Sequence, residues 1–87
     1  MQFIQEVSKL VKNLHSEAEI ENFFKELLTE SEIEILSKRW RILELLKEGK
    51  TQREIAKELK VSLCKVTRGA KILKNKNAHT TNFLIKE

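Results

Sequence analysis

The chain has 87 residues, of which 40% are hydrophobic and none is proline, a composition that favours one compact, all-helical domain. A single cysteine, Cys64, excludes an intramolecular disulfide, and two histidines are too few to complete a multi-cysteine zinc site. The net charge of +4 is unevenly divided, because residues 1–48 hold seven Lys and Arg against ten Glu, whereas residues 49–87 hold ten against three. The basic half is therefore expected to meet a polyanion.

The same residues exclude several classes of protein. Apolar residues near the N-terminus are spaced apart and interrupted by Glu6, so neither a signal peptide nor a membrane span is expected. A lone cysteine fits the reducing cytoplasm. The chain has no aspartate, no glycine-rich phosphate loop and no nucleophile with a plausible histidine partner, so it is not expected to be an enzyme. His15 and His79 are interpreted as solvated or capping residues, and no metal is predicted.

Residues 1–28 predict two amphipathic helices that serve dimerisation. The first repeats apolar residues at helical spacing: Phe3, Val7, Leu10 and Leu14. Ser16 and Glu19 form a capping box for the second, whose apolar side holds Ile20, Phe23, Phe24, Leu27 and Leu28. A domain of this size buries only about 60 to 65% of its unfolded surface, so a second copy of the chain is expected to cover both stripes.

Residues 29–50 predict one long central helix. Thr29 and Glu32 form a capping box at its start, and Gly49 is its C-terminal cap. Two apolar seams cover much more than half of its circumference: Ile33, Leu36, Trp40 and Leu43 in one, and Ile35, Ile42 and Leu46 in the other. Because this pattern suits a helix in the middle of a structure, Trp40 is interpreted as a core residue.

Residues 51–74, TQREIAKELKVSLCKVTRGAKILK, predict two short helices joined by a turn. Thr51 and Glu54 cap the first, which runs from about Gln52 to Leu59 and buries Ile55, Ala56 and Leu59. Ser62 caps the second, whose inward side holds Val66, Gly69, Ala70 and Leu73. Lys60 stands in the turn where glycine usually takes a left-handed conformation, at a cost of roughly 1 kcal/mol. The pattern is that of a helix-turn-helix, followed by a C-terminal helix over residues 75–87.

The second helix of this motif has a basic side that faces away from the core. Such a helix is expected to enter the major groove of double-stranded DNA, with Leu63, Cys64 and Thr67 near base edges and the flanking residues near phosphates. A solvated basic face is the alternative. Cys64 is interpreted as a contact to a thymine methyl group, with a redox switch as the alternative. The expected DNA contacts are Gln52, Arg53, Lys57, Leu63, Cys64, Lys65, Thr67, Lys71 and Lys74.

Residues 27–74 resemble the DNA-binding core of the tryptophan repressor family. The elements LT, R.RI..LL..G, TQREI and TRG stand in the order of the family, with one residue fewer in the turn before Thr51. The resemblance implies a six-helix, all-α chain that forms an intertwined homodimer. It also implies a sequence-specific repressor of transcription that binds an operator, with L-tryptophan as corepressor.

A ligand site follows from the same resemblance. The two arginines that hold the indole ring in the family match Arg39 and Arg68, Thr29 matches a threonine near the ligand carboxylate, and Gly69 matches a glycine of the pocket. Two guanidinium planes supply both stacking and carboxylate pairing. Ile42 and Leu43 are expected pocket walls.

Three positions depart from the family. Lys65 replaces a threonine, Ile72 replaces a serine that helps to bind the ammonium group of the ligand, and Glu26 replaces an apolar residue. Either the partner's Glu26 takes over the ammonium group, or the effector is different or absent and Ile72 packs on the dimer body. The expected ligand-site residues are Thr29, Arg39, Ile42, Leu43, Arg68, Gly69, Ile72 and Glu26.

Other functions remain open at this point. The chain is alternatively a ligand-independent helix-turn-helix regulator. The stretch EGKTQREIAKELKVS is also similar to the promoter-reading end of bacterial sigma factors, which indicates an adaptor of RNA polymerase. A third alternative is a helical protein-interaction module. Dimerisation separates the repressor from the adaptor, and salt-dependent duplex binding separates both from the third alternative.

Overall fold

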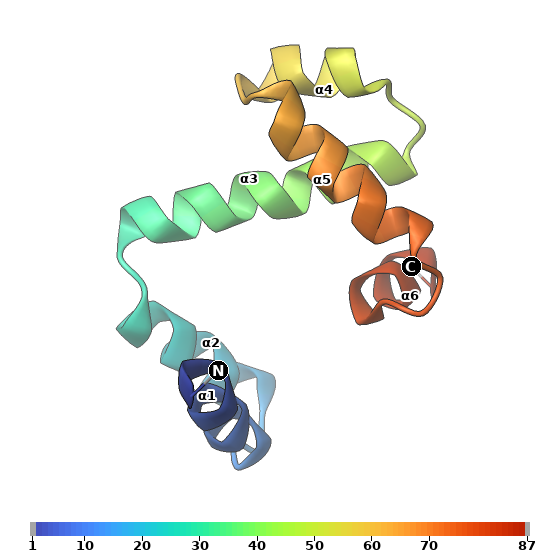
Figure 1. Cartoon of the computed structure of the whole chain (residues 1–87). Helices are drawn as coiled ribbons and strands as arrows, with labels where there is room; N and C mark the ends of the chain where they lie inside the picture. Colours follow the sequence, from blue (N-terminus) through green and yellow to red (C-terminus); the bar gives the residue numbers. More distant parts are fainter. Residues whose placement is uncertain (1, 87) are drawn as a thin grey trace. The chain divides into compact units, whose positions relative to one another are not determined.

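Six helices and no strand make up residues 2–86, the part of the chain that the computed structural model describes (Figure 1). The helices are α1 (Gln2–Lys12), α2 (Glu17–Leu27), α3 (Glu30–Lys47), α4 (Gln52–Leu59), α5 (Leu63–Lys74) and α6 (His79–Lys86). The all-α prediction is confirmed. The chain divides into two compact units, Met1–Ile33 and Glu34–Glu87.

Two of the three predicted capping boxes are complete. Thr51 Oγ1 accepts a hydrogen bond from the Glu54 N–H at 3.2 Å, and the Glu54 carboxylate accepts one from the Thr51 N–H at 3.1 Å. Thr29 and Glu32 make the same two bonds at 3.2 and 2.9 Å before α3. Accepting a backbone N–H lowers the pKa of both glutamates below the ordinary value. Local polar groups therefore fix where α3 and α4 begin.

The third capping box is only half formed. Ser16 Oγ accepts a hydrogen bond from the Glu19 N–H at 3.2 Å, as predicted. The Glu19 carboxylate, however, accepts the N–H of His15 at 2.7 Å and not that of Ser16. The cap still satisfies two backbone donors at the start of α2, so the helix begins at the predicted place.

Neither α1 nor α2 contains a buried residue. Phe3 and Ile4 are 59% and 56% exposed, and Leu10, Phe24 and Leu27 are exposed as well. Helix α1 ends at Lys12, so Leu14, which was predicted on its stripe, lies beyond it. The apolar stripes of the first unit are thus formed but uncovered within one chain.

The core of the second unit joins α3, α4 and α5. Its centre consists of residues that are at most 2% exposed: Ile42, Leu45, Ile55 and Val66. Leu46, Ala56, Leu59 and Val61 pack around this centre. Leu45 belongs to neither of the predicted seams of α3, although it is fully buried.

The N-terminal part of α3 is exposed in the single chain. Residues 31–41 are all exposed, and Trp40 keeps 41% of its surface accessible. Its ring lies against Phe83 of α6, with ring centroids 6.0 Å apart. The interpretation of Trp40 as a core residue is therefore wrong for the isolated chain, because α5 covers α3 only near its C-terminal end.

The last helix is shorter than predicted and is anchored by a buried hydroxyl. Helix α6 occupies His79–Lys86, so it begins four residues later than the predicted range 75–87. Thr81 is 1% exposed, and its hydroxyl donates to the carbonyl oxygen of Ile72 at 2.7 Å. The same carbonyl also accepts the N–H of Asn75 at 3.1 Å, so the Thr81 hydroxyl adds a second hydrogen bond to the last turn of α5. It holds α6 against the end of α5.

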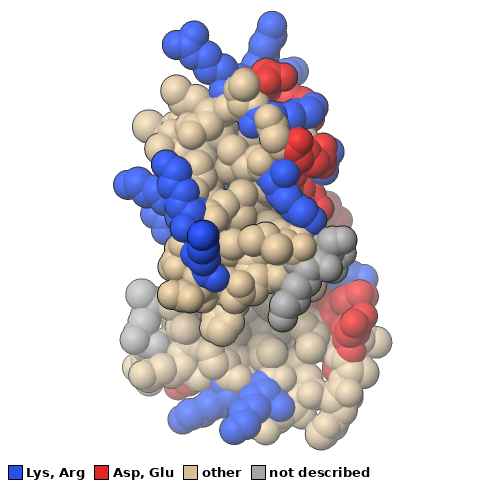
Figure 2. Space-filling model, turned by 90° about the vertical axis from the view of Figure 1, so that its right-hand side faces the viewer, with Lys and Arg blue, Asp and Glu red and all other residues tan. Residues whose placement is uncertain are grey.

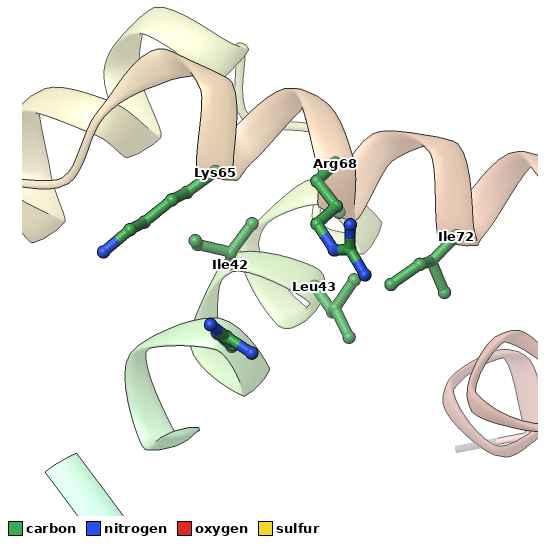
Figure 3. A pocket seen from close by; sticks show the side chains of 7 residues that line it. Ile42, Leu43, Lys65, Arg68 and Ile72 are labelled. Carbon is green, nitrogen blue, oxygen red and sulfur yellow. The ribbon is translucent and has the colours of Figure 1, made fainter. Parts of the chain in front are cut away.

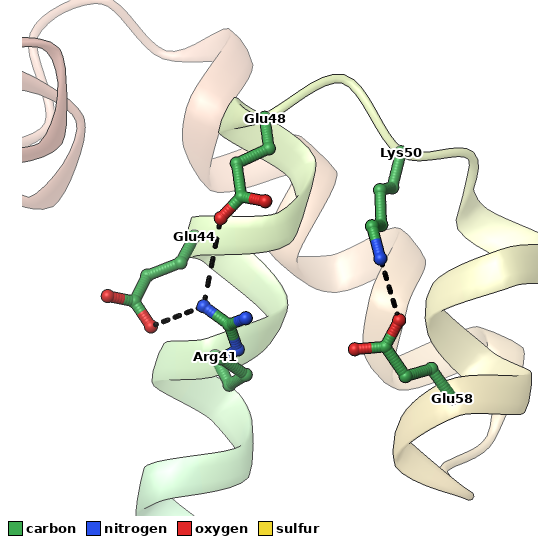
Figure 4. Close-up of polar contacts among 5 residues, drawn as sticks. All are labelled: Arg41, Glu44, Glu48, Lys50 and Glu58. Carbon is green, nitrogen blue, oxygen red and sulfur yellow. Dashed lines mark hydrogen bonds and ion pairs between the residues drawn. The ribbon is translucent and has the colours of Figure 1, made fainter.

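The connections before and after α4 are defined by backbone conformation, and one ion pair lies beside the first of them. Gly49 ends α3 with φ 95°, and Lys60 adopts the predicted left-handed conformation, with φ 56° and ψ 46°. Lys50 Nζ lies 2.8 Å from a carboxylate oxygen of Glu58 and links the loop after α3 to α4 (Figure 4). Because both side chains are well exposed, this pair contributes little to stability.

Candidate functional site

Helices α4 and α5 pack against each other across the turn formed by residues 60–62. The Val61 N–H donates to the Ala56 carbonyl at 3.1 Å, which closes α4, and the Ser62 side chain accepts the Lys65 N–H, which opens α5. Ile55 of α4 and Val66 of α5 are both fully buried between the helices. The turn therefore fixes the angle at which α5 leaves α4.

The outer face of α5 consists of the exposed residues Leu63, Cys64, Thr67, Arg68 and Lys71, which line one hollow. Thr67 Oγ1 lies 2.9 Å from Gln52 Oε1 of α4 and 3.0 Å from the Leu63 carbonyl oxygen, so its single proton is shared between two acceptors. This contact joins the outer face of α5 to the first turn of α4. Four of the nine residues predicted to contact DNA thus share one surface.

The other predicted DNA contacts lie on both sides of this face. Gln52 and the exposed Arg53 and Lys57 belong to α4, and Lys74 ends α5. In the upper part of the view in Figure 2, basic side chains stand out from the surface, with acidic side chains beside them on the right. Lys65 is the exception, because it does not line the hollow on the outer face but borders a pocket on the other side of the helix.

A cavity of about 110 Å³ lies between α3 and α5 (Figure 3). It is lined by Arg39, Ile42, Leu43, Lys65, Arg68, Gly69 and Ile72. Six of the eight predicted ligand-site residues therefore meet around one pocket. Thr29 and Glu26 belong to residues 1–33 and are not among its lining residues.

The two arginines of α3 differ in their surroundings. Arg41 forms ion pairs with Glu44 and Glu48, at N–O distances of 3.4 and 3.7 Å (Figure 4). Arg39 lines the pocket and takes part in none of the three ion pairs found among the described residues. Its guanidinium group is thus available to a ligand, whereas that of Arg41 is occupied.

A second hollow, of about 230 Å³, adjoins the first. The residues that line both are Arg39, Ile42 and Lys65, and the second hollow adds Ile35, Lys38, Lys60, Val61 and Ser62. This hollow was not predicted from the sequence. Its basic residues are visible in the sequence, but they come from the middle of α3, the turn and the start of α5, so only folding brings them together.

The described residues support neither a metal site nor a membrane-spanning helix. No group of three or more histidine, cysteine, aspartate or glutamate side chains there is arranged to hold a metal ion. No helix in the same part of the chain has the length and apolar character needed to cross a membrane.

Comparison with known proteins decides the family. The family model described as "Trp repressor protein" matches residues 2–87. The chain belongs to the Trp repressor family. The resemblance seen in residues 27–74 is thereby confirmed and extended over nearly the whole chain. Because the Trp repressor family consists of regulators without catalytic activity, the expectation that the chain is not an enzyme is confirmed.

Individual members of the family are similar to this chain over different lengths. The "Trp operon repressor homolog" of Chlamydia trachomatis serovar D is 35% identical over 79 residues, which cover 90% of this chain and 84% of the relative. The "Trp operon repressor homolog" of Xylella fastidiosa strain M23 is 50% identical over 52 residues, or 59% of this chain and 56% of the relative. No solved structure matches the chain significantly.

Proposed function

We propose that this chain is a sequence-specific, DNA-binding repressor of transcription that acts as a homodimer in the cytoplasm. A tryptophan-like small molecule in the pocket between α3 and α5 sets its affinity for the operator. L-tryptophan, the corepressor of the family, is the first candidate for this ligand. The family match favours a repressor over an adaptor of RNA polymerase.

One residue carries this proposal, because Arg68 borders both sides of α5. It lines the pocket together with Arg39, and it also lines the hollow on the outer face together with Cys64 and Thr67. A ligand held between the two arginines therefore acts directly on the position of the outer face of α5. Ligand binding and DNA binding are coupled when they favour the same position of this helix.

The proposed contacts to DNA follow from the placement of the side chains. Helix α5 enters the major groove as the second helix of a helix-turn-helix, and Leu63, Cys64 and Thr67 reach base edges. Phosphates lie near the flanking residues Gln52, Arg53, Lys57, Lys71 and Lys74. Lys65 borders the pocket, so we assign it to the ligand and not to DNA.

The homodimer is supported by the uncovered apolar surface of the first unit. Helices α1 and α2 bury no residue, yet they expose Phe3, Ile4, Leu10, Phe24 and Leu27. At about 25 cal/mol per Å² of apolar surface, leaving such stripes in water sacrifices several kcal/mol of possible stabilisation. A second copy of the chain covers them and places two copies of α5 on successive major grooves, about one turn of DNA apart.

The proposed control of DNA binding by a ligand is tested in two steps. Duplexes that bind the chain are first selected from a random library. Fluorescence anisotropy then measures the affinity for selected and for random duplexes, with and without L-tryptophan at about 1 mM, a roughly saturating concentration. We expect selective binding that weakens steeply with salt and tightens with ligand. Arg39→Ala and Arg68→Ala remove the response to ligand. Arg41→Ala is the matched control, because its side chain is already ion-paired. Equal binding to every duplex would refute the proposal.

The assembly is tested by light scattering at micromolar concentration, where the expected mass is twice 10.2 kDa. Leu10→Glu and Phe24→Glu place charges on the apolar stripes and are expected to break the dimer. Gln5→Glu, at an exposed polar position of α1, serves as the control. A folded wild-type monomer would contradict this part of the proposal.

A further inference from the structure

The hydroxyl group of Thr67 has two close neighbours, and both are hydrogen-bond acceptors. Thr67 Oγ1 lies 3.0 Å from the carbonyl oxygen of Leu63 in the same helix and 2.9 Å from Gln52 Oε1 in α4. A hydroxyl group has one proton and two lone pairs, so the proton is directed to one of these two oxygens. A partner that approaches α5 therefore meets an acceptor at Thr67 and not a donor.

The contact between Gln52 and Thr67 is set by the packing of α4 on α5. Gln52 lies three residues before Ile55 and so shares a face of α4 with it, and Thr67 directly follows Val66. Ile55 and Val66 are fully buried between the two helices. Gln52 is half-buried and Thr67 is exposed. The core thus fixes the pair, while the hydroxyl oxygen stays within reach of a partner.

Thr67 also has the only side-chain oxygen among the five described residues that line the hollow on the outer face of α5. Arg68 and Lys71 can only donate hydrogen bonds, Leu63 is apolar, and the sulfur of Cys64 is a weak acceptor. In the major groove, adenine and cytosine present an amino group, whereas guanine and thymine present a carbonyl oxygen. An oxygen that can only accept pairs with an amino group and is repelled by a carbonyl oxygen.

The amide group of Gln52 has a second function-bearing side. Its oxygen contacts Thr67, and its nitrogen makes no hydrogen bond to another described residue. No buried side-chain nitrogen in residues 2–86 lacks a partner, so this nitrogen is accessible to solvent. Gln52 is the first residue of α4, where unpaired backbone N–H groups add partial positive charge. The amide N–H groups therefore suit a phosphate oxygen, which also disfavours the reverse orientation of the amide.

We infer that Gln52 is a positioning residue for base recognition. Its amide oxygen holds the Thr67 proton away from DNA, so that Thr67 selects a base with an exocyclic amino group, adenine or cytosine. Its amide nitrogen donates to a backbone phosphate and thereby joins the position of α4 on the backbone to the base contact of α5. This inference rests on the proposed function, because it specifies how the same helix-turn-helix reads DNA.

Base analogues test the inference on the wild-type chain. The base read by Thr67 is the one whose preference, among the selected duplexes, is lost in Thr67→Val, a variant that removes the hydroxyl group and keeps the size of the side chain. We expect adenine or cytosine at this position. Exchanging adenine for purine, or cytosine for 2-pyrimidinone, removes the amino group and is expected to weaken wild-type binding about tenfold in anisotropy titrations. The affinity of Thr67→Val should not change.

Variants at Gln52 separate the acceptor from the donor. Gln52→Met has neither at a similar length, so it is expected to reduce the preference for the amino base about fivefold and to weaken every duplex. Gln52→Glu keeps the acceptor and loses the donor, so it should weaken every duplex and keep the preference. Lys57→Met, which removes an exposed cation from α4, is the matched control and should keep the preference as well.

A double variant tests whether Gln52 acts through the hydroxyl group. In Gln52→Met combined with Thr67→Val, the two losses of preference are expected not to add, because the second substitution removes the group that the first one acts on. Additive losses would show that Gln52 and Thr67 act separately. Loss of the preference in Gln52→Glu would likewise contradict the inference.

The remaining outcomes also decide. A preference for guanine or thymine at the position read by Thr67 would mean that the hydroxyl proton reaches DNA, and it would overturn the inference. The absence of any base preference that depends on Thr67 would overturn it as well. The proposed function fails by a different result, which is the absence of selective duplex binding by the wild-type chain.

Discussion

Gly69 of α5 lies directly against Ile42 of α3. A Cβ atom at position 69 would come within 2.9 Å of Ile42 Cγ2 and 3.3 Å of Leu43 Cδ2. The same three residues also line the ligand pocket. The close approach of α3 and α5 and the shape of the pocket therefore both depend on the contact of Gly69 with Ile42 and Leu43.

Gly69→Ala is expected to lower the free energy of unfolding by about 1 to 2 kcal/mol. The added methyl group forces buried neighbours to move, and this strain exceeds the gain of about 1 kcal/mol in helix propensity. Urea unfolding measures the change, with Asn82→Ala at an exposed position of α6 as the control. A more stable Gly69→Ala variant would show that α3 and α5 are free to move apart.

Thr67 is expected to determine sequence preference through its hydroxyl and its contact with Gln52. Thr67→Ala should change the difference in binding free energy between selected and random duplexes by roughly 1 to 3 kcal/mol for each lost base contact. Lys74→Ala should weaken both duplexes alike, because phosphate contacts carry no sequence information. Anisotropy titrations distinguish the two patterns, and Thr67→Ser is the matched control that keeps the hydroxyl. Equal losses on both duplexes for Thr67→Ala would remove this residue from base recognition.

Lys60→Gly is expected to stabilise the fold by about 0.5 to 1 kcal/mol, because a left-handed backbone is costly for a residue with a Cβ atom. Lys60→Ala removes the same charge without relieving the backbone, so it should give no such gain. Thermal unfolding of both variants separates conformation from charge. The same stability for glycine and alanine would mean that charge repulsion, and not the φ of 56°, is what limits this turn.

The capping boxes predict a loss of stability in acid. The pKa values of Glu32 and Glu54 are lowered in the folded chain, chiefly because each carboxylate accepts a backbone N–H, from Thr29 and Thr51 respectively. Their contribution is therefore fully present above the ordinary value of 4.5 and is lost as the pH falls through the lower, folded-state values. Urea midpoints measured from pH 6 down to pH 3 (approximate limits that bracket glutamate titration) should fall less steeply for Glu32→Gln and Glu54→Gln than for the wild type. Glu17→Gln, at an exposed position of α2, is the control.

The sequence alone was enough to predict the segments whose structure depends on near neighbours. Helix α4 begins at Gln52 and ends at Leu59 as expected, because the Thr51–Glu54 capping box and the turn at Lys60 act within a few residues. The same holds for the Ser62 cap and for Gly69 at the close approach of α5. The family motifs predicted Arg39 and Arg68 in one ligand site, and both residues line the pocket between α3 and α5.

Only the tertiary structure decided which side of each helix meets which neighbour. The helical pattern of α3 gives the angles between its residues, but not the point at which α5 crosses it, so Leu45 is buried while Trp40 is 41% exposed. In the same way, the pairing of the Thr81 hydroxyl with the Ile72 carbonyl depends on how the chain turns back after α5. Lys38, Lys60 and Lys65 are far enough apart in sequence that no local rule joins them. Packing of α3 against the turn and α5 brings their charges around one hollow, and that placement is a property of the fold.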